Sequence, residues 1–111
     1  AGVFHRLDGP AYRWWYKNGQ LGDDEWYVNG NRHRLDGPAY EAWYENGQVE
    51  YEGWYMNDVL HRLDGPAIQA RLENGQLDRE AWYINGVEYK TIAEFQVAVD
   101  LYKANEIAEL F

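Results

Sequence analysis

The sequence predicts a mainly β fold: an antiparallel β-meander built from three 28-residue repeats in a single twisted sheet, with a C-terminal capping α-helix. Three observations support this prediction. The heptapeptide His-Arg-Leu-Asp-Gly-Pro-Ala begins at His5, His33 and His61, and turn signals recur between its copies in one register. Apolar residues at helical spacing follow Thr91. A unit copied at a fixed period stacks on its neighbours, because it cannot bury its apolar face alone.

The length of 111 residues is that of one domain. We expect the β-meander over residues 1–90, with repeats at about 5–32, 33–60 and 61–88, and a helix packed on the sheet over 91–111. Ala1 and Gly2 align with the Asn-Gly turns of later units, so the chain opens inside a repeat and a trimmed or processed start is expected.

The first strand of each repeat alternates between two faces, because successive side chains of a strand point to opposite sides. One face is aromatic and aliphatic, and we predict that it is the core. It holds Tyr12, Trp14, Tyr16, Tyr40, Ala42, Tyr44, Ile68, Ala70 and Leu72. The opposite face is predicted to be the outer one. It holds Arg13, Trp15, Lys17, Glu41, Trp43, Glu45, Gln69, Arg71 and Glu73.

Each repeat contains two turn signals, typified by Asn18-Gly19 and Asn29-Gly30, for which we expect two-residue type I′ turns with positive φ at both positions. In the second strand Leu21 and Trp26 have opposite parity, so a β-bulge between them is expected to bring both to the core side. Acidic residues of this strand are expected near the bulge and the rim of the sheet. They are Asp23, Asp24, Glu25, Glu50, Glu52, Asp78 and Glu80.

A helix is predicted from about Ile92 to about Leu110. Thr91 and Glu94 form a capping box, and Phe95 and Val99 continue an apolar stripe at helical spacing. At 1.5 Å per residue the helix would be about 28 Å long, enough to lie across the sheet and cover an apolar face. We expect it to act as a terminal cap.

The recurring His, Arg and Asp suggest catalysis or metal binding, but identical copies lack the distinct roles that catalysis needs. A structural role accounts for them better: the imidazole donates one hydrogen bond in a half-buried slot, Arg pairs with Asp, and Gly permits positive φ. Three histidines on one metal would need adjacent units within about 5 Å, which the intervening strands prevent. Serine is absent and Thr91 is the only threonine. The sequence therefore predicts no enzyme, no metal and no cofactor.

The charge is uneven along the chain. Residues 1–38 carry five basic and five acidic side chains, and residues 39–111 carry five and fourteen, so the net charge of −9 lies in the second part. Negative charge repels phosphate backbones and favours a basic protein partner, although it also keeps an aromatic-rich domain in solution. Without cysteine or a membrane-length apolar segment, a cytoplasmic setting without membrane contact is expected.

The paired elements Tyr-x-Asn-Gly-Gln and Trp-Tyr-x-Asn-Gly resemble MORN-variant repeats of the kind found in antitoxin components of toxin–antitoxin modules. The fuller His-Arg-x-Asp-Gly-Pro-Ala form is similar to repeat proteins of large-genome bacteriophages. The resemblance extends from about Val3 to Lys90. It implies a non-catalytic β-meander scaffold for protein or lipid contact, and a bacterial host cytoplasm if the protein is phage-encoded. The Asp-Gly-Pro corner and the acidic balance depart from the usual pattern and argue against lipid.

Three functional hypotheses follow. The first is a protein-binding module, an antitoxin-like or phage-encoded inhibitor that masks a basic surface of its target; its site would be Trp15, Trp43, Arg71, Glu41, Glu45 and Glu73. The second is a small-ligand binder for nucleotide-type molecules; its site would be Arg6, Arg34 and Arg62. The third is a purely structural repeat protein. If the helix instead packs over the two tryptophans, the first site is not free.

Overall fold

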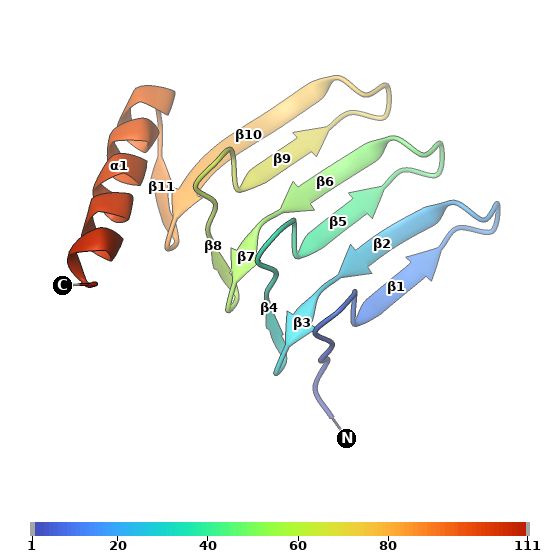
Figure 1. Ribbon diagram of the computed structural model, residues 1–111. Helices are drawn as coiled ribbons and strands as arrows, with labels where there is room; N and C mark the ends of the chain where they lie inside the picture. Colours follow the sequence, from blue (N-terminus) through green and yellow to red (C-terminus); the bar gives the residue numbers. More distant parts are fainter. Residues whose placement is uncertain (1, 111) are drawn as a thin grey trace.

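The computed structural model describes residues 2–110 and shows a mainly β protein with one C-terminal helix. Seven strands form an antiparallel sheet in the order β1-β2-β5-β6-β9-β10-β11, and β3-β4 and β7-β8 form two small sheets (Figure 1). The elements are β1 Tyr12–Trp15, β2 Leu21–Glu25, β3 Tyr27–Val28, β4 Asn31–Arg32, β5 Tyr40–Trp43, β6 Val49–Gly53, β7 Tyr55–Met56, β8 Val59–Leu60, β9 Ile68–Arg71, β10 Leu77–Ile84, β11 Val87–Tyr89 and α1 Ile92–Ala108. The predictions for Ala1 and for a helix end at Phe111 lie outside the described residues.

Two kinds of turn join the strands. In the β3-β4 hairpin Asn29 and Gly30 both have positive φ, 51° and 83°, which confirms the type I′ turn. The turn between β1 and β2 is different, because there only Gly19 has positive φ, 86°. The Gly19 amide donates to the Tyr16 carbonyl, and the side chain of Asn18 accepts a hydrogen bond from the Gln20 amide. The prediction of a two-residue turn was therefore wrong at this position.

A β-bulge follows the first residue of β2, β6 and β10. Trp15 pairs with Leu21 while Trp14 pairs with Asp23, which leaves Gly22 as the extra residue. A Cβ atom on Gly22 would approach the Trp14 ring to 2.6 Å, so glycine is required where tryptophan is opposite. The structure thus confirms the predicted β-bulge in this strand and places it at Gly22.

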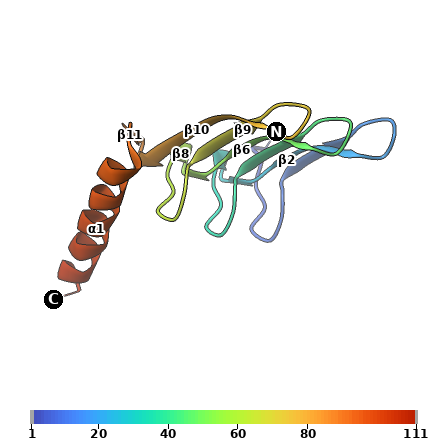
Figure 2. The ribbon, with the colours of Figure 1, turned by 90° about the horizontal axis from the view of Figure 1, so that it is seen from above.

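The bulge brings Leu21 to the same side of the sheet as Trp26, but not to the side predicted as core. Leu21 pairs directly with Trp15 and therefore shares the face of Trp15. Arg34, which stacks on Trp26, also acts electrostatically on Glu41 of this face. The loops that precede β1, β5 and β9 project from the sheet on one side, and α1 slants away on the same side (Figure 2).

The face predicted as core, here called the tyrosine face, is covered only in part. Arg32 lies over the Tyr40 ring at 4.6 Å, and Tyr40 packs edge-on against Tyr51. Trp14 and Leu72 of this face are exposed. The prediction that this face is the core is confirmed only for Ala42 and Ile68, which are buried, because the sheet is a single layer. Ala81 of β10, which pairs with Ile68, is also buried.

Helix α1 begins at Ile92, as predicted, and Thr91 caps it by accepting a hydrogen bond from the Glu94 amide at 3.1 Å. The helix packs against β10 and β11 at the opposite end of the sheet from β1, instead of lying across the strands (Figure 1). Phe95 and Val99 form a buried cluster there with Ile84 of β10. Among residues 2–110 no helix is long and apolar enough to cross a membrane.

Candidate functional site

A row of polar side chains crosses six neighbouring strands on the face that carries Trp15. The strand register aligns one residue from each strand in this row. The aligned residues are Arg13, Asp24, Glu41, Glu52, Gln69 and Glu80. Since four of the six are carboxylates, we call this side of the sheet the carboxylate face.

The two ends of the row are internally neutralised or hydrogen-bonded. Arg13 donates to both carboxylate oxygens of Asp24, at 2.5 and 2.8 Å, in a bidentate ion pair. Gln69 donates its amide to Glu80 at 2.8 Å. The carboxylates in the middle of the row are therefore those whose negative charge is least balanced by neighbouring side chains.

In the middle of the row Glu41 of β5 and Glu52 of β6 are direct cross-strand partners. Like charges opposite one another destabilise a sheet. Burial and, next, the charge of Glu52 raise the pKa of Glu41, while the positive charge of Arg34 acts in the other direction. No ion pair within residues 2–110 includes either carboxylate. A cation supplied from outside would therefore relieve an existing repulsion.

A second row on the same face is apolar except for Arg71; we call it the apolar row. Trp15 pairs with Leu21, and Trp43 pairs with Val49 after the bulge. Arg71 pairs with Leu77 in the same way. Trp15 is 56% exposed, and Arg13 lies 5.9 Å from its ring centroid. This side of the sheet thus combines an aromatic and aliphatic row with the row of carboxylates.

The structure brings together most of the predicted partner-binding residues. Trp15, Trp43 and Arg71 share the apolar row, and Glu41 belongs to the neighbouring polar row. Glu45 and Glu73 follow strand ends and lie in the turns, where their backbone carbonyls accept hydrogen bonds from Asn18 and Asn46. Because α1 packs against β10 and β11, the alternative that it covers the two tryptophans was wrong.

Sequence reasoning missed three carboxylates of the site. Asp24, Glu52 and Glu80 were expected near the bulge or the rim, yet they lie within strands and in register with Glu41. The sequence does contain a signal for them, because they alternate in step with Trp26, Trp54 and Trp82. The bulge places residues of that parity on the face of Trp15. The residues at the bulge are instead Gly22, Glu50 and Asp78.

The arginines proposed for a small ligand are engaged within the chain. Arg34 stacks on Trp26 and Arg62 on Trp54, each at 3.9 Å from the ring centroid. Each guanidinium also donates to the aspartate two residues on and to a proline carbonyl four residues on. Arg6 makes the same two local hydrogen bonds and is more exposed. These contacts leave fewer donors for a phosphate group.

The histidines of the heptapeptide accept hydrogen bonds instead of donating them. Nδ1 of His5, His33 and His61 accepts from the backbone amides of Asn29, Asn57 and Asn85, at 3.0 to 3.1 Å. Each imidazole therefore ties the loop in front of one strand to a hairpin turn 24 residues further on. The predicted donor role was wrong, because Nδ1 of each ring receives its hydrogen bond from an asparagine amide.

The glycine of the heptapeptide is required for space. Gly37 does not have positive φ, which contradicts the predicted reason for it. A Cβ atom at this position would lie 2.6 Å from Cζ of Arg34. The glycine therefore makes room for the guanidinium that covers Trp26.

The tyrosine face contains one carboxyl group of unusual character. Asp23 is 8% exposed, and its Oδ1 atom has no hydrogen-bond partner among the described residues. Burial and the neighbouring carboxylate of Glu25 raise the pKa of Asp23 to about 7. Within residues 2–110 no group of three or more His, Cys, Asp and Glu side chains is arranged to hold a metal ion.

Comparison with family models finds no match, and comparisons with curated proteins and with solved structures find none either. The resemblance to MORN-variant repeats therefore remains a prediction from the sequence motifs.

Proposed function

We propose that this chain is a non-catalytic protein-binding repeat module whose carboxylate face covers a basic surface of a target protein. The observation that carries the proposal is the facing pair Glu41 and Glu52, half-buried and without a cation partner in the described part of the chain. A lysine or arginine of the partner would remove this repulsion on binding, which makes association with a basic surface more favourable than with a neutral one.

The apolar row supplies the second half of the argument. Exposed aromatic side chains provide desolvated contact area, and carboxylates beside them steer a basic partner and set its register. Trp15 and Trp43 lie two strands apart, about 10 Å, so one flat partner surface contacts both. The net charge of −9 adds long-range attraction for such a partner.

The finer features of the proposal rest on sequence. We infer that the three 28-residue repeats are the structural units of the sheet, with α1 as their terminal cap. The motif resemblance favours an antitoxin-like or phage-encoded inhibitor that acts in the cytoplasm, in the bacterial host if the gene is a phage gene. Specificity would then come from the pattern of the two rows, because no catalytic step selects the target.

Differential capture from a bacterial extract tests the proposal. The full chain is immobilised beside a face variant, Glu41→Gln/Glu52→Gln/Glu80→Gln, and a charge-matched control, Glu50→Gln/Glu94→Gln/Glu109→Gln. We expect wild type and control to retain the same basic proteins and the face variant to lose them. For a retained protein, Trp43→Ala should cost about 2 kcal/mol of binding free energy. Equal retention by both triple variants would mean that only bulk charge acts, and the proposal would fail.

Small-ligand binding by Arg6, Arg34 and Arg62 is the second candidate. Nucleotide binding would require the three guanidiniums to leave their aspartate partners, and Arg34 and Arg62 to leave their tryptophans as well. A thermal-shift screen of the full chain against nucleotides tests it, with a concentration-dependent rise of the melting temperature as the supporting result.

A further inference from the structure

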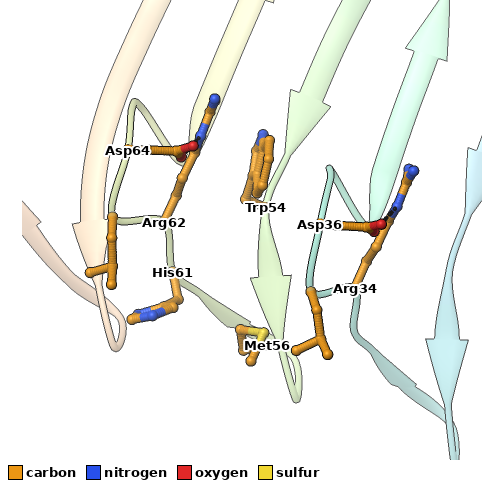
Figure 3. A pocket seen from close by; sticks show the side chains of 9 residues that line it. Arg34, Asp36, Trp54, Met56, His61, Arg62 and Asp64 are labelled. Carbon is orange, nitrogen blue, oxygen red and sulfur yellow. Dashed lines mark hydrogen bonds and ion pairs between the residues drawn. The ribbon is translucent and has the colours of Figure 1, made fainter. Parts of the chain in front are cut away.

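Two grooves lie between successive heptapeptide loops and have equivalent walls. The first, with a volume of about 510 Å³, is lined by Arg6, Leu7, Trp26, Val28, His33, Arg34, Leu35 and Asp36. The second, of about 330 Å³, is lined by Arg34, Leu35, Asp36, Trp54, Met56, His61, Arg62, Leu63 and Asp64. In the second groove Trp54 lies between two Arg–Asp pairs (Figure 3). Every residue of the first groove has its counterpart 28 positions later in the second.

A further shift of 28 positions leads to a third groove, and this one is occupied by α1. The counterparts of Leu35, Trp54, Met56 and His61 are Leu63, Trp82, Ile84 and Tyr89. These four residues pack around Phe95 and Val99 of α1. Tyr102 of α1 also contacts His61, with ring centroids 5.4 Å apart. The third groove is therefore filled by Phe95, Val99 and Tyr102 of helix α1.

The leucines show what the helix contributes. Leu7 and Leu35, in the open grooves, are each 75% exposed. Leu63 is partly buried, because the cluster around α1 packs against it. The recurring leucine thus packs against a helix in the third groove and is exposed to solvent in the other two.

We propose that the two open grooves bind helices of a partner protein that present an aromatic residue and, four positions later, an aliphatic one. Phe95 and Val99 show this spacing in the third groove. The carboxylates of Asp36 and Asp64, with side chains 87% and 78% exposed, stand at the rim, each paired with the arginine two residues before it. The net charge of −9 favours basic residues beside the apolar pair. Successive grooves are two strands apart, about 10 Å, which matches the spacing of packed helices.

This inference goes beyond the proposed function, since the groove residues differ from those of the carboxylate face. The probe is a synthetic peptide of residues 91–110, stapled between positions 96 and 100, where Gln96 already contacts Asp100 on the exposed side of the helix. We expect the full chain to bind two peptides. Replacement of Phe95 and Val99 by alanine in the peptide should weaken binding at least tenfold. Lysine in place of Glu94 and Glu109 should strengthen it severalfold, and an unchanged affinity would overturn the basic preference.

The protein variants separate groove binding from other events. Leu35 lines both grooves, so Leu35→Glu should reduce peptide affinity at least tenfold at both sites. Leu7 lines only the first, so Leu7→Glu should reduce the stoichiometry from two to one. Leu72→Glu, an exposed leucine of the tyrosine face, is the matched control. Circular dichroism checks that each variant is folded.

Absence of saturable binding to the wild-type chain up to about 1 mM peptide overturns the inference. Binding that survives Leu35→Glu overturns it too, because the peptide would then displace α1 or bind elsewhere. Neither result touches the capture experiment with the carboxylate-face variants, so the two proposals fail separately.

Discussion

Replacement of Asp23 by asparagine should stabilise the protein at neutral and alkaline pH. Asp23 is buried on the tyrosine face beside Glu25, and its Oδ1 atom lacks a partner in the described part of the chain. Its pKa of about 7 lies above that of an unfolded aspartate, 3.8. The folded state therefore binds the proton more tightly, and the contribution of Asp23 to stability is full below pH about 4 and falls as the pH rises to about 7.

The size of the effect follows from the shift. A rise of the Asp23 pKa from 3.8 to about 7 corresponds to about 4 kcal/mol between acid and alkaline solution. Asp23 lies on the strand next to the edge strand β1, so water screens its charge in part. We therefore expect Asp23→Asn to raise the free energy of unfolding by about 2 kcal/mol at pH 8 and to leave it nearly unchanged at pH 4.

Urea denaturation at pH 4, 5.5 and 8, followed by tryptophan fluorescence, measures this difference. Asp78→Asn, at the exposed bulge position of β10, is the matched control and should change the free energy of unfolding by less than about 0.5 kcal/mol. If Asp23→Asn lowers stability at pH 8, then Asp23 is ionised and stabilising. If the gain is the same at pH 4, then the gain does not come from the charge of Asp23. Either result would show that the reasoning from its burial is wrong.

Two further predictions concern packing. Val99→Ala should lower the free energy of unfolding by about 2 kcal/mol, because Val99 is 2% exposed. Replacement of the exposed Val97 by alanine should change it by less than about 0.5 kcal/mol. Equal losses of stability in thermal melts would mean that α1 is not docked as described. Gly37→Ala should lower the free energy of unfolding by about 1 kcal/mol, because the added methyl group pushes Arg34 off Trp26. In an Arg34→Ala background the same substitution should have no further effect. A double-mutant cycle measured by urea denaturation tests this.

Local sequence patterns predicted the elements well. Asn29-Gly30 indicated a type I′ hairpin because glycine and asparagine tolerate positive φ, and the turn has that geometry. Thr91 indicated the helix start because its hydroxyl satisfies a free backbone amide, and it does so here. The opposite parity of Leu21 and Trp26 indicated a bulge, which lies at Gly22. Each of these depends on residues within a few positions of one another.

The candidate site was predicted in part for the same reason. Alternation along β1, β5 and β9 grouped Trp15, Trp43 and Arg71, and the register confirms that they share a face. The contribution of β2, β6 and β10 depended on the exact position of the bulge, since a shift of one residue exchanges the two faces of a strand. Asp24, Glu52 and Glu80 were therefore assigned only when the pairing was known.

The sequence by itself determined the strands, the turn at Asn29-Gly30, the presence of a bulge and the start of the helix, because backbone preferences and side-chain alternation act over a few residues. Only the tertiary structure decided that the tyrosine face is half open, that Arg34 stacks on Trp26, that His33 accepts from a distant amide and that α1 fills a groove beside Trp82. These features join residues far apart in the chain. Several arrangements satisfy the same local pattern, and packing between distant segments selects one of them.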